Sequence, residues 1–366
     1  MTDYLPLPGT PVEELDTPCI IVDLDIAEAN IAKLQTAANE MGVDVRPHSK
    51  THKSPYWARK QIAAGAIGIC CAKVGEAEVM VEAGVTDVMI TNQVIGTLKI
   101  ARLVALARAA KMIVAVDDSS NVDDLSRAAS DAGAELGVIV EINVGQDRCG
   151  VDGKGAVDLA KQIAAAPGLR FDGLMGYEGH IVAERDYETR KTEAEKAMAI
   201  LTGAAAQIHD AGIEVRVVSA AGTGTYAITG RVDGVTELQC GSYIFMDGDY
   251  VEVFDDFTPA LSVLSTVVSR QREDVAVTDL GLKSISVDRG LADVLSPSGA
   301  SVMGHSEEHT RIELKGEEAR SLRVGDKVRV RPKHGDTTIN LHDYYFGVRN
   351  GKLEAAIPIP GRGKFR

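Results

Sequence analysis

The sequence lacks the features that would place the protein in a membrane or outside the cell. No apolar run approaches the ~20 residues that a transmembrane helix requires. The N-terminal segment MTDYLPLPGTPVEEL has acids and prolines where a signal peptide would carry basic residues and a long apolar stretch. The five cysteines form no CxxC pair and their number is odd, which does not suit a disulfide framework. These absences predict a protein of the reducing cytoplasm.

Positive charge is scarce as well. The 366 residues include 39 Lys and Arg against 53 Asp and Glu, so the formal net charge is −14. An acidic protein is a poor electrostatic partner for nucleic acid or an anionic membrane, and we expect neither as a partner. A local basic pocket for a small phosphate is compatible with this charge. The hydrophobic share of 45% is ordinary for a folded protein.

One pattern repeats through the first two thirds of the chain, in which a short apolar run alternates with a helical segment. The apolar runs span residues 43–50, 67–73, 87–92, 112–118, 136–143, 171–179, 215–220 and 235–241. Strands that are apolar on both faces and are separated by helices form parallel sheets, and eight such units predict a (β/α)8 barrel. An open doubly wound sheet is less favoured, because no GxGxxG follows the first strand. The last intervening segment, 221–234, is rich in Gly and Thr and has room for only a short helical turn.

Two segments lie outside this repeat. An earlier strand is predicted at 19–25 and is followed by a helix at 26–42. After about Pro259 the apolar runs become short, alternating and β-branched, and an Asn-Gly pair within VRNGKLEAAIPI indicates a hairpin. We therefore predict a barrel over residues 21–257. An all-β domain is predicted from residues 1–20 and 258–366.

Lys50 is the first candidate for chemistry. The active site of a (β/α)8 barrel lies at the carboxyl ends of its strands, and Lys50 ends the first strand. The surrounding RPHSKTHK contains one Arg, two His and two Lys. Neighbouring cations lower the pKa of a lysine and favour Schiff-base formation. A solvated surface lysine is the ordinary alternative.

Two polar loops follow the seventh and eighth strands, where such barrels often bind phosphate. They are SAAGTGT (219–225) and CGSY (240–243). Glycines there let backbone amides approach an anion, and Thr223, Thr225 and Ser242 add hydroxyl donors. Tight turns with incidental hydroxyls are the alternative. A Schiff-base lysine opposite a phosphate cup suggests pyridoxal phosphate.

The predicted all-β domain carries a candidate metal site in RPKHGDTTINLHDYY. His334 and Asp336 are two residues apart, and in an extended segment such residues face the same side. An imidazole and a carboxylate without a thiolate suit Mn²⁺ or Mg²⁺ better than structural Zn²⁺. A polar loop is the alternative. The adjacent pair His342 and Asp343 ranks lower, because neighbours on a strand point to opposite faces.

Taken together, these motifs make the chain resemble the D-threonine aldolase and D-serine dehydratase family of pyridoxal-phosphate enzymes, which have the alanine racemase fold. The resemblance covers nearly the whole chain in order, and its most specific motif is RPHxKTHK. The matching segments are LDTPCIIVDLDIAEANI (15–31), RPHSKTHK (46–53), CCAKVGEAEVM (70–80), DRCGV (147–151), GLMGYEGH (173–180), AGTGT (221–225), ELQCGSYIFMD (237–247) and KHGDTTINLHD (333–343).

The resemblance implies a role for each matching residue. Lys50 would hold the cofactor covalently, Arg148 would contact its phenolic oxygen, and Tyr177 would lie near the pyridine nitrogen. His334 and Asp336 would hold the metal. The phosphate would be bound by residues of the two loops, among them Ser219, Gly222, Thr223, Gly241 and Ser242. Family members form their site between two subunits, so the resemblance also implies a homodimer.

The metal motif separates two branches of the family. Dehydratases usually have His-x-Cys where this chain has His334-Gly335-Asp336, and the chain has no cysteine after Cys240. We therefore predict an aldolase, a carbon–carbon lyase that cleaves D-threonine to glycine and acetaldehyde. A 3-hydroxy-D-aspartate aldolase, with Arg349 or Lys333 near the second carboxylate, is the first alternative. A dehydratase, a racemase, a pyridoxal-phosphate carrier and a cofactor-independent lysine aldolase are the others.

Proton transfer is the least determined step of the predicted reaction. His180, His48 and His52 are the candidates, and no spacing argument chooses among them. His180 is the residue that we assign to it from the sequence.

Overall fold

The computed structural model describes residues 5–366 and divides the chain into two compact units. The first, the barrel unit, comprises Ala32–Gly241 with Gly363–Arg366. The second, the β-domain unit, comprises the chain up to Ile31 and Ser242–Arg362. Residues 1–4, which the sequence analysis assigned to the all-β domain, lie outside the described residues.

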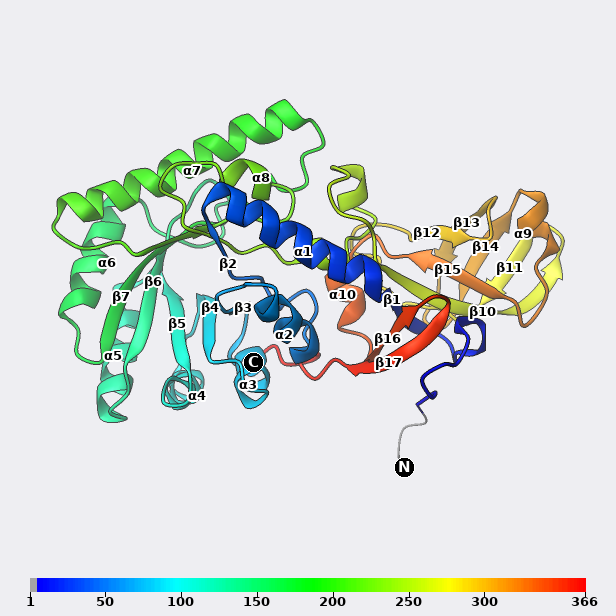
Figure 1. The fold of residues 1–366 in the computed structure, drawn as a ribbon, viewed down its shortest axis with the longest axis horizontal. Coiled ribbons are helices and arrows are strands. Elements are labelled where there is room, and N and C mark those ends of the chain that lie inside the picture. Colours follow the sequence, from blue (N-terminus) through cyan, green and yellow to red (C-terminus); the bar gives the residue numbers. More distant parts are fainter. Residues whose placement is uncertain (1–4) are drawn as a thin grey trace. The chain divides into compact units, whose positions relative to one another are not determined.

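Eight parallel strands form the barrel unit (Figure 1). They are β2 (Asp44–Val45), β3 (Ile69–Cys71), β4 (Asp87–Gln93), β5 (Lys111–Val116), β6 (Leu136–Glu141), β7 (Leu169–Met175), β8 (Val217–Ala220) and β9 (Glu237–Leu238). Their order in the sheet is β2-β9-β8-β7-β6-β5-β4-β3. The two ends of the sheet join through hydrogen bonds from Ile67 N–H to the Val45 carbonyl (3.0 Å) and from Cys70 N–H to the Pro47 carbonyl (2.9 Å). Each predicted strand is therefore confirmed, as is the barrel that they form.

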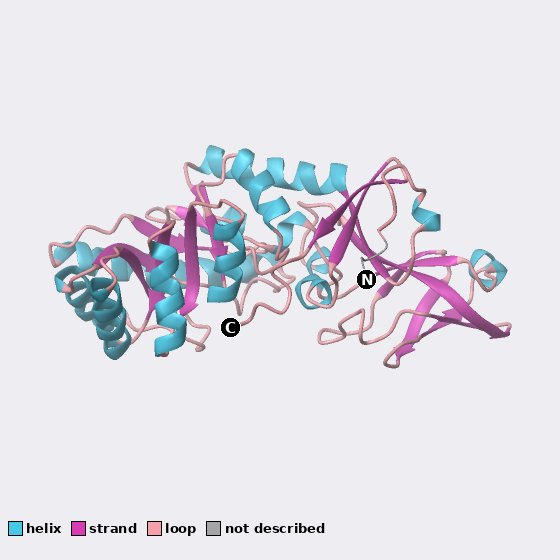
Figure 2. Cartoon of the chain, turned by 90° about the horizontal axis from the view of Figure 1, so that it is seen from below, coloured by secondary structure: helices cyan, strands magenta, loops and turns pink. Residues whose placement is uncertain are grey.

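Helices connect these strands, and Figure 2 shows them beside the sheet. They are α2 (Pro55–Ala63), α3 (Val74–Glu82), α4 (Thr97–Ala107), α5 (Ser119–Asp131), α6 (Gly153–Ala165), α7 (Tyr187–Asp210) and α8 (Tyr226–Thr229). Aspartates begin three of them: the side chains of Asp118, Asp152 and Asp186 accept backbone N–H groups of the first helical turn. The predicted short turn between the last two strands is α8.

The barrel core has an inner and an outer layer because the strands are apolar on both faces. Every residue of β6 is buried. One cluster, which includes Cys70, Met89 and Ile139, is formed by side chains of alternate strand positions. The larger cluster lies between the strands and the helices and includes Leu103 and Leu201. Such continuous apolar runs are typical of parallel sheets covered by helices.

The β-domain unit is built on a mostly antiparallel sheet. Its strands are β1 (Cys19–Asp23), β10 (Leu261–Arg272), β11 (Val275–Thr278), β12 (Asp293–Ser296), β13 (Ala300–His305), β14 (Thr310–Leu314), β15 (Lys327–Arg331), β16 (Tyr344–Arg349) and β17 (Lys352–Pro358). Strand β1 pairs antiparallel with β10 and parallel with β16. The hairpin between β16 and β17 turns at Asn350 and Gly351, which have φ of +51° and +73° as a type I′ turn requires. The predicted hairpin is confirmed.

Short helices complete this unit. They are α9 (Glu317–Ser321), α10 (Gly335–Ile339) and the 3-10 turns Val12–Glu14, Ser242–Ile244 and Tyr250–Glu252. The long helix α1 (Leu24–Met41) contains the boundary between the two units, after Ile31. Among residues 5–366, no helix combines the length and the apolar character needed to cross a membrane.

Candidate active site

His48 holds the turn in which Lys50 lies. The backbone N–H of His48 donates to the Cys240 carbonyl (3.0 Å), which anchors the turn to the end of β9. Nδ1 of His48 accepts the backbone N–H of Lys50 (3.3 Å), and Nε2 lies 3.0 Å from the Thr91 hydroxyl. Since Nδ1 is the acceptor, this pattern assigns the ring proton to Nε2. The imidazole thus orders the backbone that carries Lys50.

The electrostatic environment keeps His48 neutral. Burial lowers the pKa of His48 well below its ordinary value, and the positive charges of Lys50, His52, Lys53 and Arg148 lower it further. The same charges identify this end of the barrel as a local basic region in an acidic protein. Such a region suits the phosphate that the sequence predicts.

The other candidates in RPHSKTHK have structural partners. Lys53 forms an ion pair with the buried carboxylate of Glu76, which also accepts the backbone N–H groups of Ala72 (2.8 Å) and Lys73 (3.2 Å). His52 is fully buried. Its Nδ1 accepts the Ser54 N–H (3.1 Å), and Nε2 lies 3.1 Å from Gln61 Oε1. His52 therefore supports the start of α2 and is poorly suited to proton transfer.

The structure brings Arg148, Tyr177 and the loop after β8 together. The Arg148 guanidinium lies 5.7 Å from the centre of the Tyr177 ring, within the range of a cation–π contact. The ring also borders Gly222, where an added Cβ would lie 3.1 Å from it. His180 is exposed, and its Nε2 would lie 3.2 Å from a Cβ at Gly145. Residues after β6, β7 and β8 thus converge at the carboxyl ends of the strands.

Close packing explains the glycines of the predicted phosphate loop. A Cβ at Gly224 would lie 1.9 Å from the carbonyl oxygen of Val182, so no side chain fits there. A Cβ at Gly241 would lie 2.6 Å from the Thr51 hydroxyl. These glycines have a packing reason that is independent of any ligand, and they leave the backbone of both loops close to its neighbours.

A buried glutamate that the sequence analysis did not single out organises this loop. Glu178 is fully buried and follows β7. Its Oε1 accepts the hydroxyls of Thr225 (2.7 Å) and Thr229 (2.6 Å), and its Oε2 accepts the backbone N–H of Ala221 (3.3 Å). Burial of a carboxylate cannot be inferred from its place in GYEGH, and for this reason the sequence did not reveal it.

Ser219 lies deeper than its predicted role suggests. Its hydroxyl is fully buried, donates to Glu237 (2.6 Å) and accepts from the Gln239 amide (2.7 Å). The single hydroxyl proton is therefore used within the barrel and is not directed to a phosphate. Ser242 belongs to the β-domain unit, where its carbonyl accepts the Met246 N–H (2.7 Å).

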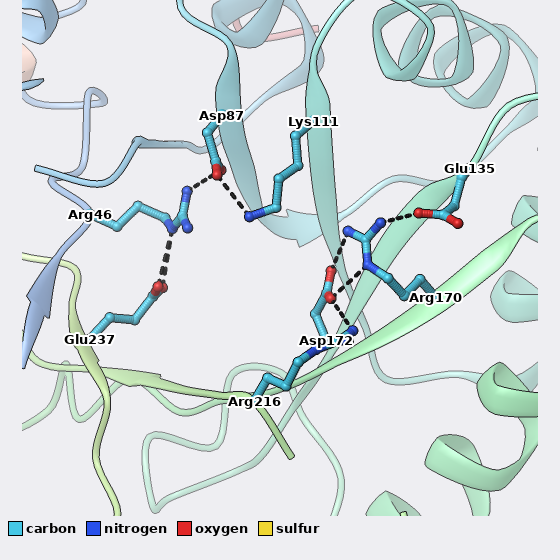
Figure 3. Close-up of polar contacts among 8 residues, drawn as sticks. All are labelled: Arg46, Asp87, Lys111, Glu135, Arg170, Asp172, Arg216 and Glu237. Carbon is cyan, nitrogen blue, oxygen red and sulfur yellow. Dashed lines mark hydrogen bonds and ion pairs between the residues drawn. The ribbon is translucent and has the colours of Figure 1, made fainter. Parts of the chain in front are cut away.

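A network of ion pairs occupies the amino ends of the strands (Figure 3). The buried Arg46 lies between Asp87 (2.5 Å), at the start of β4, and Glu237 (3.3 Å), at the start of β9. In Figure 3, Asp172 lies between Arg170 (2.9 Å) and Arg216 (2.7 Å). Each of these charges lies beside a charge of opposite sign. They are at the end of the barrel that does not carry catalytic residues in this fold.

Carboxylates also gather near the ends of β5 and β6. Ligand atoms of Asp117, Glu141 and Cys149 lie within 4.8 Å of one another. Asp117 accepts the backbone N–H of Gly150 (2.9 Å), and Glu141 accepts the Gln93 amide (2.6 Å). Burial raises the pKa of Glu141. Asp117 therefore holds the loop that contains Arg148, while Glu141 links β6 to Gln93 at the end of β4.

The local geometry of the predicted metal motif differs from the prediction. The segment was expected to be extended, but His334 is the N-cap of α10 and Asp336 lies in its first turn. Both side chains therefore project from the start of a short helix. Gly335 between them donates its N–H to the buried Asp247 carboxylate (2.9 Å). Burial raises the pKa of Asp247 to about 6, and the nearby Asp336 charge adds to this effect.

Asp288 orients the imidazole of His334. Its Oδ2 lies 2.6 Å from His334 Nδ1, while Oδ1 accepts the hydroxyls of Ser286 (2.6 Å) and Thr337 (3.0 Å). Partial burial alone would raise the pKa of Asp288, but these hydrogen bonds outweigh it and lower the pKa to about 2. An ionised Asp288 places the ring proton on Nδ1 and the lone pair on Nε2. This is the arrangement of a metal-ligating histidine.

The rival pair is engaged elsewhere. Nε2 of His342 donates to the Ser284 carbonyl (2.7 Å), and burial lowers the pKa of this imidazole. Asp343 forms an ion pair with Arg362. The two candidate cations for a second substrate carboxylate are likewise paired. Lys333 lies between acids, and Arg349 binds the carboxylates of Asp25, Glu28 and Glu354.

Comparison with known proteins identifies the family. The model of the alanine racemase N-terminal domain matches residues 22–249, and a serine dehydratase domain model matches residues 260–348. The chain belongs to this family of alanine racemase-like enzymes. The resemblance predicted from the sequence is thereby confirmed, together with the fold.

Members of the family match over the full length of the chain. The 3-hydroxy-D-aspartate aldolase of Paracoccus denitrificans (strain Pd 1222) is 41% identical and covers 99% of this chain and 96% of its own length. A D-threonine aldolase from Arthrobacter is 39% identical, covering 97% and 95%. The crystal structure of D-threonine aldolase from Filomicrobium marinum superimposes with a TM-score of 0.95, at 40% identity over 98% and 99%. The prediction of a carbon–carbon lyase agrees with these names.

Proposed function

We propose that the protein is a pyridoxal-phosphate aldolase that depends on a divalent metal and cleaves β-hydroxy-D-amino acids to glycine and an aldehyde. Family membership supports pyridoxal phosphate as the cofactor and aldol cleavage as the reaction. The observation that carries the choice of an aldolase is the His334–Asp336 motif with Asp288 behind it, in a chain that has no cysteine after Cys240.

The carboxyl end of the barrel fits the cofactor. Lys50 follows β2 and would bond to the cofactor's aldehyde carbon through Nζ. Arg148 and Tyr177 would orient the ring, while Thr223 and the backbone near Gly241 would contribute to the phosphate site. The positive charge around His48 and the convergence of Arg148, Tyr177 and the loop after β8 are the features that match such a ligand. When bound, pyridoxal phosphate supplies an electron sink for cleavage at the substrate α-carbon.

The donor set in the β-domain unit fits a hard divalent ion. Nε2 of His334 and the carboxylate of Asp336 would hold it, since Nδ1–H of His334 donates to Asp288 and leaves the lone pair on Nε2. Nitrogen and oxygen donors without a thiolate suit Mn²⁺ or Mg²⁺. The ion would act as a Lewis acid toward the substrate hydroxyl. We propose Mn²⁺ as the ion and, as the family resemblance implies, a homodimer. The odd number of cysteines without a CxxC pair favours a cytoplasmic enzyme.

His180 remains the proposed proton-transfer residue. It is exposed and lies beside Gly145, in the group of residues that includes Arg148 and Tyr177. His48 and His52, by contrast, are buried and both use their Nδ1 atoms to accept a backbone N–H. An exposed imidazole in contact with water can exchange a proton with solvent more readily than a buried one.

A product assay tests the proposed function. Purified protein would be incubated with D-threonine, D-serine and 3-hydroxy-D-aspartate, with Mn²⁺ and after chelation. We expect glycine and acetaldehyde from D-threonine, with the rate lost on chelation and restored by Mn²⁺. Formation of a 2-oxo acid in place of glycine would contradict the proposal and identify a dehydratase.

A 3-hydroxy-D-aspartate aldolase is the second candidate, because the relative of that name is 41% identical. Its substrate differs from D-threonine by a carboxylate in place of a methyl group. Lys333 and Arg349 both have acidic partners within the β-domain unit. A preference of at least about tenfold in kcat/KM for 3-hydroxy-D-aspartate in the same assay would establish this alternative.

Paired variants test the proposed metal site. Asp336→Ala should lose bound Mn²⁺ and most D-threonine cleavage, while the visible absorption of the bound cofactor should persist. Asp343→Ala is the matched control, because its carboxylate pairs with Arg362 and should not affect metal content. An active, metal-replete Asp336→Ala beside an inactive Asp343→Ala would transfer the site to the rival pair.

A further inference from the structure

The carboxylate of Glu178 lies at the base of the loop 221–225 and accepts three hydrogen bonds from groups of the segment 221–229. The side chain is fully buried, as are those of Thr225 and Thr229. A buried carboxylate is stable only when several donors satisfy it, and here two hydroxyls and one backbone amide do so. The loop is therefore folded around this residue.

An ionised carboxylate accepts hydrogen bonds and cannot donate them. The proton of the Thr225 hydroxyl must consequently point toward Glu178 Oε1, 2.7 Å away. The oxygen of the same hydroxyl then accepts the backbone N–H of Gly222 (3.1 Å). This chain of hydrogen bonds fixes both groups within the loop.

These hydrogen bonds change which groups of the loop can donate to a phosphate. The sequence analysis included the Thr225 hydroxyl and the Gly222 amide among the groups that could face a phosphate. A hydroxyl has one proton and an amide has one, and in the structure each of these is already donated. Neither can bind an anion without breaking a buried hydrogen bond.

We propose that Glu178 is a positioning residue for the cofactor phosphate. It sets the conformation of the loop 221–225 by holding Thr225, Thr229 and Ala221, and through Thr225 it holds Gly222 against Tyr177. Thr225 serves this internal network and is not a phosphate ligand. The inference rests on the proposed function, in which this loop binds pyridoxal phosphate.

The amide variant Glu178→Gln isolates the acceptor role. A glutamine has nearly the same shape, but an NH2 donor replaces one carboxylate oxygen. If the NH2 faces Ala221 N–H, two donors meet, and if it faces Thr225 and Thr229, both hydroxyl protons lose their acceptor. A buried amide N–H without an acceptor is costly, and the loop should rearrange. Thr229→Val is a milder second variant, which removes one donor to Glu178 and keeps the side-chain volume.

The test compares pyridoxal 5′-phosphate with pyridoxal, which lacks the phosphate. Both would be titrated into the cofactor-free protein and followed by visible absorption. In Glu178→Gln we expect the affinity for pyridoxal 5′-phosphate to fall by about tenfold or more, and that for pyridoxal to change by less than about twofold. Thr229→Val should shift the ratio in the same direction by about threefold.

The control is Asp172→Asn, which alters a different buried carboxylate that lies within β7 and pairs with Arg170 and Arg216. It should reduce stability and leave the ratio of the two affinities unchanged. An unchanged ratio in both Glu178→Gln and Thr229→Val would overturn the proposal, as would an equal loss of affinity for both ligands. If the unmodified protein itself showed no preference for the phosphorylated ligand, the proposed function of the loop would fail instead.

Discussion

The two ends of the barrel use charged residues in opposite ways. At the amino ends of the strands, Arg46, Asp87, Glu237 and Asp172 lie in ion pairs in which each charge faces an opposite one (Figure 3). At the carboxyl ends, the positive charges of Lys50, Lys53 and Arg148 lie around His48, whose pKa is lowered by burial and by these charges. In the first arrangement, the charges neutralise one another within the fold. The second leaves positive potential for an anionic ligand.

This difference separates structural from chemical residues of the same type. Lysine and arginine occur at both ends, so composition alone cannot distinguish them. At the amino end Arg46 pairs with acids of two other strands, Asp87 and Glu237, while Arg170 pairs with Asp172 of its own strand. At the carboxyl end the cations follow strands and lie in turns. We expect substitutions at the two ends to separate stability from activity.

The largest effect should come from the carboxyl end. Lys50→Ala should lower the rate of D-threonine cleavage by more than about a thousandfold, because the cofactor loses its covalent attachment. The visible absorption of the bound cofactor should disappear together with the activity. Thermal unfolding should change little, since Lys50 is not part of the core. Retention of a borohydride-reducible covalent cofactor would show that another lysine, such as Lys53 or Lys73, holds it.

The second effect should come from the amino end and should be the reverse. Arg46→Met leaves Asp87 and Glu237 without their shared buried cation, and breaking such a pair costs about 3–5 kcal/mol of unfolding free energy. Because these groups lie away from the proposed site, kcat/KM of the folded protein should stay within about threefold. Lys111→Gln removes the exposed partner of Asp87 and should cost less than about 1 kcal/mol. A large loss of kcat/KM in stable Arg46→Met would end the distinction between the two ends.

The third effect concerns two aspartates of the β-domain unit. Asp343 forms an ion pair with Arg362, whereas Asp288 accepts a hydrogen bond from Nδ1 of His334. Asp288→Asn should weaken Mn²⁺ binding by about 10- to 100-fold, because the lone pair on Nε2 is no longer enforced by an ionised acceptor. Asp343→Asn should leave the affinity unchanged. Mn²⁺ titration of the cofactor-free protein, followed by electron paramagnetic resonance, measures both.

The smallest effect concerns pH. Burial and nearby cations lower the pKa of His48 in the folded state, so the unfolded chain takes up a proton at this residue first as the pH falls. The stabilisation is fully present above the unfolded value of about 6.5 and declines below it, by at most about 1.4 kcal/mol per pH unit. His48→Asn should flatten the dependence of the unfolding free energy between pH 7.5 and 5.5, on the order of this amount. Arg46→Met should keep the slope of the unmodified protein, and identical slopes in all three would contradict the prediction.

Much of the fold could be predicted because the signals are local. The apolar runs 87–92 and 136–143 correspond closely to β4 and β6, and the Asn-Gly pair at 350–351 forms the expected hairpin. Each of these depends on the period of apolar residues or on the backbone freedom of two residues. Such features need no information from distant parts of the chain.

The candidate site was predictable only in part. Lys50, Arg148 and Tyr177 belong to the sequence motifs that carry the family resemblance, and their roles stay predictions. The helix at His334 was missed, because a five-residue segment with threonines has no clear helical pattern. Asp288 lies 46 residues before its histidine partner, and no sequence spacing links the two. Ser219 could not be assigned to the barrel interior without the positions of Glu237 and Gln239.

The sequence by itself determined the alternation of strands and helices, the all-β character of the C-terminal segment and the motifs that carry chemistry, because these follow from residue type and short spacing. The tertiary structure decided which polar residues are available for chemistry and which are used internally. Glu178 and Thr225 satisfy each other, as do Arg46 and Glu237, while His48 is kept neutral beside Lys50. Burial and the direction of each hydrogen bond settle these roles, and both depend on residues that come together only when the chain folds.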